Sequence, residues 1–351
     1  MNMPSYPTVR LTPKGDARAI RHGFPWVYAN ELVTDRRTRG LTAGALAVLE
    51  DANRVPLGLV TVNAASKIIC RMIDRDPEAV IDTAWFAAKL TRALIHRERI
   101  YDQPFYRLVH AEADGLPGVV IDRFGDTAVI QPNAAWADAL IEPLCDALVQ
   151  VTGVTTVVMN ASGRARSLEG LDDRMGMLRG TVPTDPIPVP MNGATYMADV
   201  MGGQKTGLFF DQRSNHAFAA SLSRGARVLD MFSHVGGFGL AALAGGAASV
   251  LAVDGSEPAL ALAHKGAQAM GVSDKFETRK GDAFDTLAEL AEEGAQFDLV
   301  VCDPPAFAPN KASLEAGLRA YERIARLAAT LVADGGYLMV CSCSNAADLT
   351  R

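Results

Sequence analysis

The stretch that decides the fold is residues 227–256, RVLDMFSHVGGFGLAALAGGAASVLAVDGS. Its apolar run 228–232 is typical of a buried parallel strand, because both faces of such a strand are covered. A glycine-rich turn and an Ala/Leu run that predicts a short helix follow, and the run 249–253 predicts a second strand ending in Asp254. The stretch therefore predicts a βαβ unit with an acidic residue at the tip of its second strand.

This pattern indicates a nucleoside site. Glycines let the backbone approach a ligand, and a carboxylate at a strand tip accepts hydrogen bonds from ribose hydroxyls. Asp230 and Asp254 are separated by close to the usual interval of roughly 20 residues. The turn lacks G-x-G-x-x-G and begins with a carboxylate, which would repel a pyrophosphate, so a cationic nucleoside such as S-adenosylmethionine fits better. Any α/β core with a glycine turn would be the plainer explanation.

Composition bounds the class of protein. The chain has 351 residues, enough for two or three domains, and its 49% hydrophobic and 21% charged residues are ordinary for a soluble globular protein. No apolar run is long enough to span a bilayer and no signal peptide is evident, so we expect a cytoplasmic protein without membrane contact. We also expect no metal and no disulfides, because the cysteines are scattered and form no C-x-x-C pair: Cys70, Cys145, Cys302, Cys341 and Cys343.

Residues 1–76 are predicted to form a small β-rich domain, since apolar stretches alternate with turns. The net charge of the chain is −6, yet Lys and Arg outnumber Asp and Glu in residues 1–78, which is compatible with local nucleic-acid contact. Arg18, Arg21 and His22 fall on a short predicted helix near Trp26, and basic side chains beside aromatics suit RNA. The alternative is a solvated basic face and aromatic core residues, and for the aromatics we favour core.

Residues 77–185 predict a second, α+β unit. His110, Glu112 and Asp114 alternate, so they would share one face of an extended segment and could bind metal or perform acid–base chemistry. They could equally form a polar turn that fixes a domain junction, and we favour this structural role. A proline-rich linker is expected at residues 181–190.

Residues 186–351 predict a doubly wound α/β domain with five strands. Four of these strands end in a residue that can take part in binding or catalysis, and Ser256 can cap the helix after the second strand. The carboxyl ends of the strands in such a sheet converge on one crevice. The sequence therefore predicts one site lined by Asp254, Asp282, Asp303 and Cys343.

Several motifs resemble known families. The pattern K-G-x-x-R-x-x-x-x-G-x-P-W-V-Y-x-N-E at residues 14–31 resembles the start of PUA domains, which are compact RNA-binding β-barrels. The strand ends from Asp230 to Cys343 resemble the Rossmann-like class I S-adenosylmethionine-dependent methyltransferases. Asp-Pro-Pro-Ala-Phe at 303–307 is similar to the turn of enzymes that act on nucleobases, and Gly-Gln-Lys-Thr-Gly at 203–207 and Phe-Asp-Gln-Arg at 210–213 match the loop before the cofactor strand. The whole resembles the PUA-containing cytosine-5 methyltransferases of large-subunit ribosomal RNA.

The resemblance implies S-adenosylmethionine as cofactor, ribosomal RNA as partner and a thiol nucleophile. Carbon 5 of cytosine attacks a methyl sulfonium only after a thiolate has added at carbon 6. Cys343, in Ser-Cys-Ser, resembles the family nucleophile, and strand alternation would put Cys341 on the same side as a neighbour without a role. Asp303 would hold the Watson–Crick edge and assist protonation at nitrogen 3.

The remaining implied residues fall into two sets. Besides Arg18, Arg21 and His22, the RNA would contact Pro304, Pro305 and Phe307, whose ring can stack on a flipped base. The cofactor pocket would comprise Gln204, Lys205, Asp211, Arg213, Asp230, Phe232, Gly236, Gly237, Asp254, Ser256, Asp282, Ala283 and Asp303.

Two departures and several alternatives stay open. His216 stands where arginine is expected. The chain also stops soon after Cys343, although class I methyltransferases usually have two more strands, so either the sequence is truncated or the sheet lacks its last strands. A guanine or other nucleobase N-methyltransferase would use Asp303 and Pro304 without a thiol, and a catalytically silent RNA-binding protein would not bind the cofactor. A nicotinamide oxidoreductase is the least favoured reading, because G-x-G-x-x-G is missing. A homodimer is left open.

Overall fold

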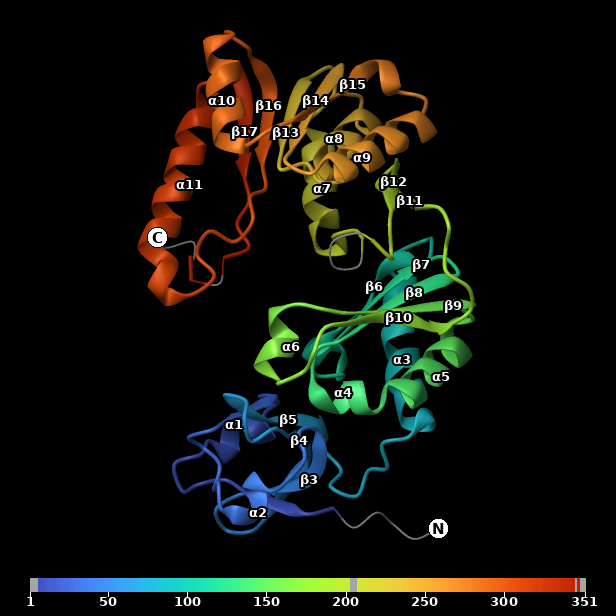
Figure 1. The fold of residues 1–351 in the computed structure, drawn as a ribbon, viewed down its shortest axis with the longest axis vertical. Helices are drawn as coiled ribbons and strands as arrows, with labels where there is room; N and C mark the ends of the chain where they lie inside the picture. Colours follow the sequence, from blue (N-terminus) through green and yellow to red (C-terminus); the bar gives the residue numbers. More distant parts are fainter. Residues whose placement is uncertain (1–5, 203–206, 345, 348–351) are drawn as a thin grey trace. The chain divides into compact units, whose positions relative to one another are not determined.

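The computed structural model describes residues 6–202, 207–344 and 346–347 (Figure 1). The chain divides into two compact units, Met1–Pro183 and Thr184–Arg351. The first carries two five-stranded sheets, and the second carries a hairpin and a five-stranded parallel sheet. Within the described ranges, no helix has both the length and the apolar character needed to cross a bilayer.

The first sheet of unit 1 closes on itself. Its strands run in the order β1-β3-β4-β5-β2, and a bridge between Leu11 and Leu32 joins the two edges. Thr12 N donates to Glu31 O at 2.8 Å across this seam, so the sheet has the closed form expected of a PUA-like barrel. Its elements are β1 (Thr8–Arg10), α1 (Ala17–Arg21), β2 (Trp26–Tyr28), α2 (Arg36–Arg39), β3 (Ala45–Glu50), β4 (Pro56–Val62) and β5 (Ile68–Asp74).

The second sheet of unit 1 forms the expected α+β domain. Its strand order is β10-β9-β8-β7-β6, and only the β8–β9 pair is parallel. Helices α3 and α5 pack against each other, and the Phe86 and Trp136 rings stack at 5.9 Å in the core. The elements are α3 (Thr83–Glu98), β6 (Phe105–His110), η1 (Ala111–Asp114), β7 (Val119–Phe124), β8 (Thr127–Pro132), α4 (Ala135–Ala139), α5 (Ile141–Thr152), β9 (Thr156–Ala161), α6 (Arg164–Leu168) and β10 (Arg174–Arg179).

Unit 2 begins with a hairpin where part of a linker was predicted. The strands β11 (Ile187–Met191) and β12 (Ala194–Ala198) pair antiparallel, and β12 packs on α9. A two-stranded sheet is all edge, so Pro188 and Pro190 fit without costing interior ladder hydrogen bonds. The linker prediction was wrong over these residues because proline marks edge strands as well as loops.

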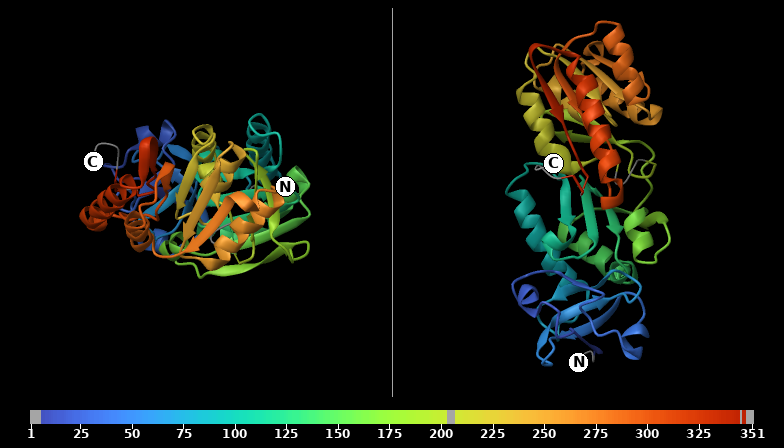
Figure 2. Two further views of the ribbon diagram at one scale, coloured as in Figure 1. Left: turned by 90° about the horizontal axis from the view of Figure 1, so that it is seen from above. Right: turned by 90° about the vertical axis from the view of Figure 1, so that its left-hand side faces the viewer.

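The parallel sheet of unit 2 has the order β15-β14-β13-β16-β17, a doubly wound arrangement. Helices α8 and α9 pack together on one face, and α10 and α11 cover the other (Figures 1 and 2). The predicted class, a Rossmann-like domain after a PUA-like barrel and an α+β domain, is confirmed. The elements are η2 (Phe210–Gln212), α7 (Arg213–Ser221), β13 (Arg227–Met231), α8 (Gly237–Ala244), β14 (Ser249–Asp254), α9 (Glu257–Ala269), η3 (Ser273–Lys275), β15 (Phe276–Lys280), α10 (Ala283–Glu292), β16 (Phe297–Cys302), η4 (Lys311–Ser313), α11 (Leu314–Ala329) and β17 (Val332–Val340).

Candidate active site

The turn between β13 and α8 wraps around one carboxylate. Asp230 is fully buried, and its Oδ2 accepts from Gly239 N at 2.7 Å. The turn is tight: Phe232, His234 and Gly236 all have positive φ, at 61°, 50° and 81°. Two of these are not glycine, and such strained backbone is held only where the surroundings demand it, as at ligand sites.

The carboxylate at the end of β14 ties two loops together. Asp254 Oδ2 accepts from His234 N at 2.9 Å, and its Oδ1 accepts from Ser256 N at 2.8 Å. The Ser256 hydroxyl accepts from Ala259 N at 3.4 Å and so caps α9, as predicted from the sequence. Asp254 is therefore fixed beside the turn that holds Asp230.

The ends of β15 and β16 carry the next two carboxylates. Asp282 is the N-cap of α10, because its Oδ1 accepts from the backbone of Phe284, and it lies exposed just before the buried Ala283. Asp303 is half-buried and accepts from Gln212 Nε2 at 3.2 Å and 3.0 Å on its two oxygens. Strand order places β13, β14 and β16 side by side, so their three carboxylates end at one edge of the sheet.

The turn after β16 presents a mixture of buried and exposed groups. Pro304 is buried and Pro305 is exposed. The half-buried Phe307 ring packs at 5.0 Å from Tyr321 and at 6.2 Å from Phe284. A base that stacks here would therefore meet an aromatic cluster already assembled.

The two cysteines after β17 occupy different environments. We expected strand alternation to put Cys341 and Cys343 on the same side, but β17 ends at Val340, so the alternation does not extend to them. Cys341 is half-buried, and burial raises the pKa of its thiol to about 12, with the charges of Asp303 and Asp230 adding to the effect. Cys343 is exposed. Of these two thiols, Cys343 is therefore the one that a substrate can reach.

Serine hydroxyls hold the segment that carries Cys343. Ser342 Oγ donates to Tyr321 Oη at 3.1 Å, and the Ser344 Oγ lies 2.8 Å from the same oxygen. Ala308 N donates to Ser344 Oγ at 2.9 Å. Both neighbours of Cys343 are thus tied to α11 or to the turn after β16.

Comparison with known proteins identifies the class of enzyme. Residues 154–349 match the family model of S-adenosylmethionine-dependent methyltransferases, and residues 9–75 match that of PUA-like domains. The chain belongs to the S-adenosylmethionine-dependent methyltransferases. It is 35% identical to "Ribosomal RNA large subunit methyltransferase I" of Shewanella denitrificans over 96% of this chain and 85% of that one. It is 34% identical to the protein of the same name from Aeromonas salmonicida, over 94% and 84%.

Solved structures agree on the fold of this methyltransferase. A Streptococcus mutans protein described as SAM-dependent methyltransferase superposes with a TM-score of 0.80, at 18% identity, over 98% of this chain and 87% of its own. A second structure, described as a methyltransferase complexed with SAH, gives a TM-score of 0.79 at 19% identity, over 95% and 85%. The shared architecture therefore spans nearly the whole chain.

The residues present fit S-adenosylmethionine. Asp230 Oδ1 and Ser233 Oγ are buried without a hydrogen-bond partner in the described part of the chain, so each has hydrogen-bonding capacity that a ligand would satisfy. Burial raises the pKa of Asp230 to about 7, and the charges of Asp303 and Asp254 act in the same direction. A cationic ligand would relieve this crowding of carboxylates, because an opposite charge favours the ionised form.

The methyltransferase site includes two residues for which the sequence predicted no role, Tyr196 and His216. Tyr196 Oη donates to Gly237 O at 3.1 Å, and the His216 ring lies 4.6 Å from Phe238 and 6.1 Å from Tyr196. Burial lowers the pKa of His216 to about 4, so it is neutral at physiological pH. Tyr196 and His216 therefore pack against the glycine turn, and the departure from arginine at position 216 was the only sequence signal for this contact.

The loop before the cofactor strand is described in part. Gln204 and Lys205 lie outside the described residues. Asp211 is exposed in η2, and Arg213 begins α7, where its carbonyl accepts from Asn192 Nδ2 at 2.7 Å. The residue between them, Gln212, contacts Asp303. Gln212 belongs to the Phe-Asp-Gln-Arg motif, but the motif predicted no role for this residue.

The basic residues expected to meet RNA lie on or next to α1. Arg21 Nη2 pairs with Asp51 at 2.6 Å, and His22 Nδ1 lies 2.8 Å from Arg18 O. Arg18, Arg21 and His22 are exposed. The three are therefore together at the surface of the barrel, as the helical spacing predicted.

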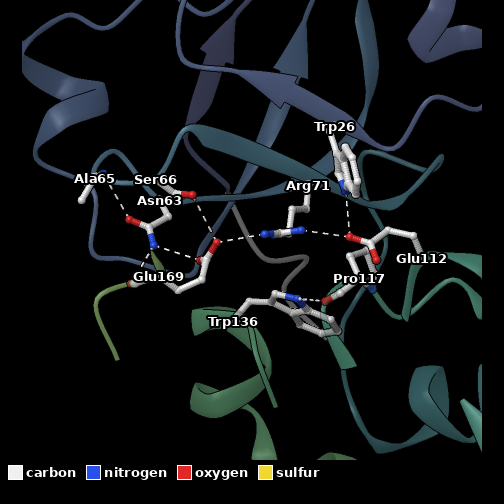
Figure 3. A network of polar contacts seen from close by, with 9 residues as sticks. All are labelled: Trp26, Asn63, Ala65, Ser66, Arg71, Glu112, Pro117, Trp136 and Glu169. Carbon is white, nitrogen blue, oxygen red and sulfur yellow. Dashed lines mark hydrogen bonds and ion pairs between the residues drawn. The ribbon is translucent and has the colours of Figure 1, made fainter. Parts of the chain in front are cut away.

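A polar network joins the barrel to the α+β domain within unit 1 (Figure 3). Arg71 bridges Glu112 Oε1 at 2.9 Å and Glu169 Oε1 at 3.0 Å. Trp26 Nε1 also donates to Glu112 Oε1, at 2.7 Å, so Glu112 fixes a domain junction. Asp114 pairs with Arg97 at 2.6 Å, and no group of three or more potential metal ligands occurs in the described ranges.

Proposed function

We propose that this methyltransferase forms 5-methylcytosine in large-subunit ribosomal RNA, with Cys343 as nucleophile. The name shared by relatives at about 35% identity over most of the chain supports the substrate. The PUA-like barrel with its exposed basic helix supports RNA as the partner. Such a substrate implies a cytoplasmic enzyme.

The placement of Cys343 is the observation that carries the proposed mechanism. Strands β16 and β17 are hydrogen-bonded neighbours, and Cys341 N donates to Cys302 O at 2.9 Å just past their ends. The segments leading to Asp303 and to Cys343 therefore leave the sheet side by side. An acid–base group and an exposed thiol at one sheet edge are what cytosine-5 chemistry requires.

The residues would act in a definite order. The Cys343 thiolate adds to carbon 6 of the cytosine while Asp303 assists protonation at nitrogen 3, which makes carbon 5 nucleophilic. Bound S-adenosylmethionine supplies an electrophilic methyl group that carbon 5 takes up. A base in the solvent then removes the proton from carbon 5, the double bond between carbons 5 and 6 re-forms as the Cys343 thiolate leaves, and nitrogen 3 returns its proton to Asp303.

The other proposed residues surround this chemistry. We propose that Asp230, Asp254 and Asp282 hold the amino-acid and nucleoside parts of the cofactor, together with the loop residues around Gly236. Pro304, Pro305 and Phe307 would contact the flipped base. Arg18, Arg21 and His22 would meet RNA phosphates.

The test compares two cysteine variants on protein-free large-subunit ribosomal RNA. Cys343→Ala should abolish 5-methylcytidine formation, measured by nucleoside mass spectrometry, and Cys341→Ala should retain it. RNA carrying 5-fluorocytidine, which lacks the departing proton, should trap wild-type protein as a covalent adduct. Activity that survives Cys343→Ala would indicate an N-methyltransferase, and failure to bind S-adenosylmethionine in calorimetry would indicate a catalytically silent RNA-binding protein.

A further inference from the structure

Gln212 faces Asp303 with its amide. A carboxylate only accepts hydrogen bonds, so the Gln212 group that lies 3.0 Å and 3.2 Å from its two oxygens is the Nε2 donor. One nitrogen near both oxygens restrains the plane of the carboxylate, because rotation would lengthen one of the two contacts. Gln212 thus fixes the Asp303 side chain from another part of the chain.

A second amide fixes Gln212 in turn. With Nε2 toward Asp303, the Gln212 Oε1 points the other way, and Asn215 Nδ2 donates to it at 2.6 Å. Gln212 ends η2 and precedes α7, and Asn215 lies three residues later on the same turn. The opposite amide orientation is excluded for Gln212, because its Oε1 would then face the Asp303 carboxylate, oxygen against oxygen.

We propose that Asn215 and Gln212 form a positioning relay that orients Asp303 for the target base. The proposal rests on the proposed function, in which Asp303 meets the Watson–Crick edge of cytosine. The exocyclic amine of cytosine is a donor that needs a carboxylate oxygen at a defined angle. The proton that the Cys343 thiol releases reaches nitrogen 3 by way of the same carboxylate, which takes it up and passes it on. A restrained carboxylate offers this geometry before the base arrives, and small misplacements can cost up to about 100-fold in rate.

The relay makes a prediction that a merely structural contact does not. Gln212→Leu keeps the bulk of the side chain and removes the amide, so single-turnover methyl transfer should fall roughly 10- to 100-fold. Asn215→Ala should reduce it by several-fold. Because Asn215 acts only through Gln212, adding Asn215→Ala to Gln212→Leu should cause no further loss, whereas independent roles would multiply.

The experiment uses full-length protein with protein-free large-subunit ribosomal RNA. Ser214→Ala is the matched control, since Ser214 is an exposed neighbour on the same turn. S-adenosylmethionine affinity, measured by calorimetry, and the thermal midpoint should stay at wild-type values in every variant. The pH dependence of the single-turnover rate should change in Gln212→Leu and remain unchanged in Ser214→Ala.

Three results would overturn the relay. Multiplicative losses in the double variant, a fall in cofactor affinity parallel to the rate, or tighter RNA binding by Gln212→Leu would each do so. The last would mean that the amide merely occupies the place of the base and must leave. Failure of the proposed function can be told apart from failure of the relay. If the wild-type protein methylates a base other than cytosine, the two single variants and the double variant are compared on that base.

Discussion

Replacement of Arg71 by methionine should destabilise unit 1 by about 3 kcal/mol. Arg71 lies on β5 with 15% of its side chain exposed and holds two carboxylates of the α+β domain, Glu112 and Glu169. The Glu169 side chain is only 5% exposed. Methionine keeps much of the packing of the arginine stem and removes both ion pairs.

The magnitude follows from what the change leaves behind. Removing one partner of a buried pair costs about 3–5 kcal/mol, because the other charge stays buried. Here Asn63 Nδ2 and Ser66 Oγ still donate to Glu169, and Trp26 still donates to Glu112, so the low end applies. Arg71→Lys should restore only part of the lost stability, since one ammonium group is a poor substitute for a guanidinium whose two terminal nitrogens pair with two carboxylates.

Tryptophan fluorescence during urea unfolding is the appropriate assay. All three tryptophans of the chain, at positions 26, 85 and 136, lie in unit 1, so the signal reports that unit alone. The control is Arg10→Met, whose ion pair with Glu50 involves a side chain that is 38% exposed and should contribute less than about 1 kcal/mol. An Arg71→Met midpoint no lower than that of Arg10→Met, at equal m-value, would refute the reasoning.

Three further changes test the cofactor turn of unit 2. Gly237→Ala should weaken S-adenosylmethionine binding, measured by calorimetry, and lower the free energy of unfolding by about 1–3 kcal/mol, because the new Cβ would lie 2.8 Å from Nε2 of the buried His216. Gly176→Ala is the control and should change neither quantity, since its Cβ would meet no atom within 4 Å. In the wild type, His216 should lower the free energy of unfolding by on the order of 3 kcal/mol as pH falls from about 6.5 to about 4, because the imidazole is protonated at higher pH in the unfolded chain than in the folded one. His216→Gln should abolish this pH dependence. Asp230 should act in the opposite direction in cofactor-free protein: its protonation should stabilise the folded chain by on the order of 4 kcal/mol below about pH 4, and this stabilisation should be lost as pH rises through about 7. Asp230→Asn should abolish this pH dependence. Urea unfolding across this pH range, followed by circular dichroism, measures both, and unchanged profiles in the two variants would contradict the assigned pKa shifts.

The cofactor domain was largely predictable from the sequence because its strands are buried on both faces. Continuous apolar runs mark such strands, and their ends are where polar residues gather. The sequence therefore predicted that Asp254, Asp282 and Asp303 lie at one edge of the sheet. The motif at residues 14–31 likewise indicated a PUA-like barrel, and the structure closes that sheet through Leu11 and Leu32.

Prediction from local sequence patterns failed where the structure of a segment depends on its tertiary contacts. Proline around residue 188 suggested a linker, yet an isolated hairpin has edges that accept it. Strand alternation predicted that Cys341 and Cys343 lie on the same side of the sheet. The strand ends at Val340, however, and Cys341 is half-buried while Cys343 is exposed. Alternation holds only as long as the strand does.

The sequence by itself determined which kinds of group are available: acidic strand tips, glycines that allow a tight turn, and a thiol after the last strand. Tertiary structure alone decided which of them meet. Gln212 and Asp303 lie 91 residues apart in the chain, and Tyr196 and Gly237 lie 41 apart, yet each pair is hydrogen-bonded. Contacts of this kind depend on how helices and loops pack around the sheet, and that packing leaves no periodic trace in the sequence.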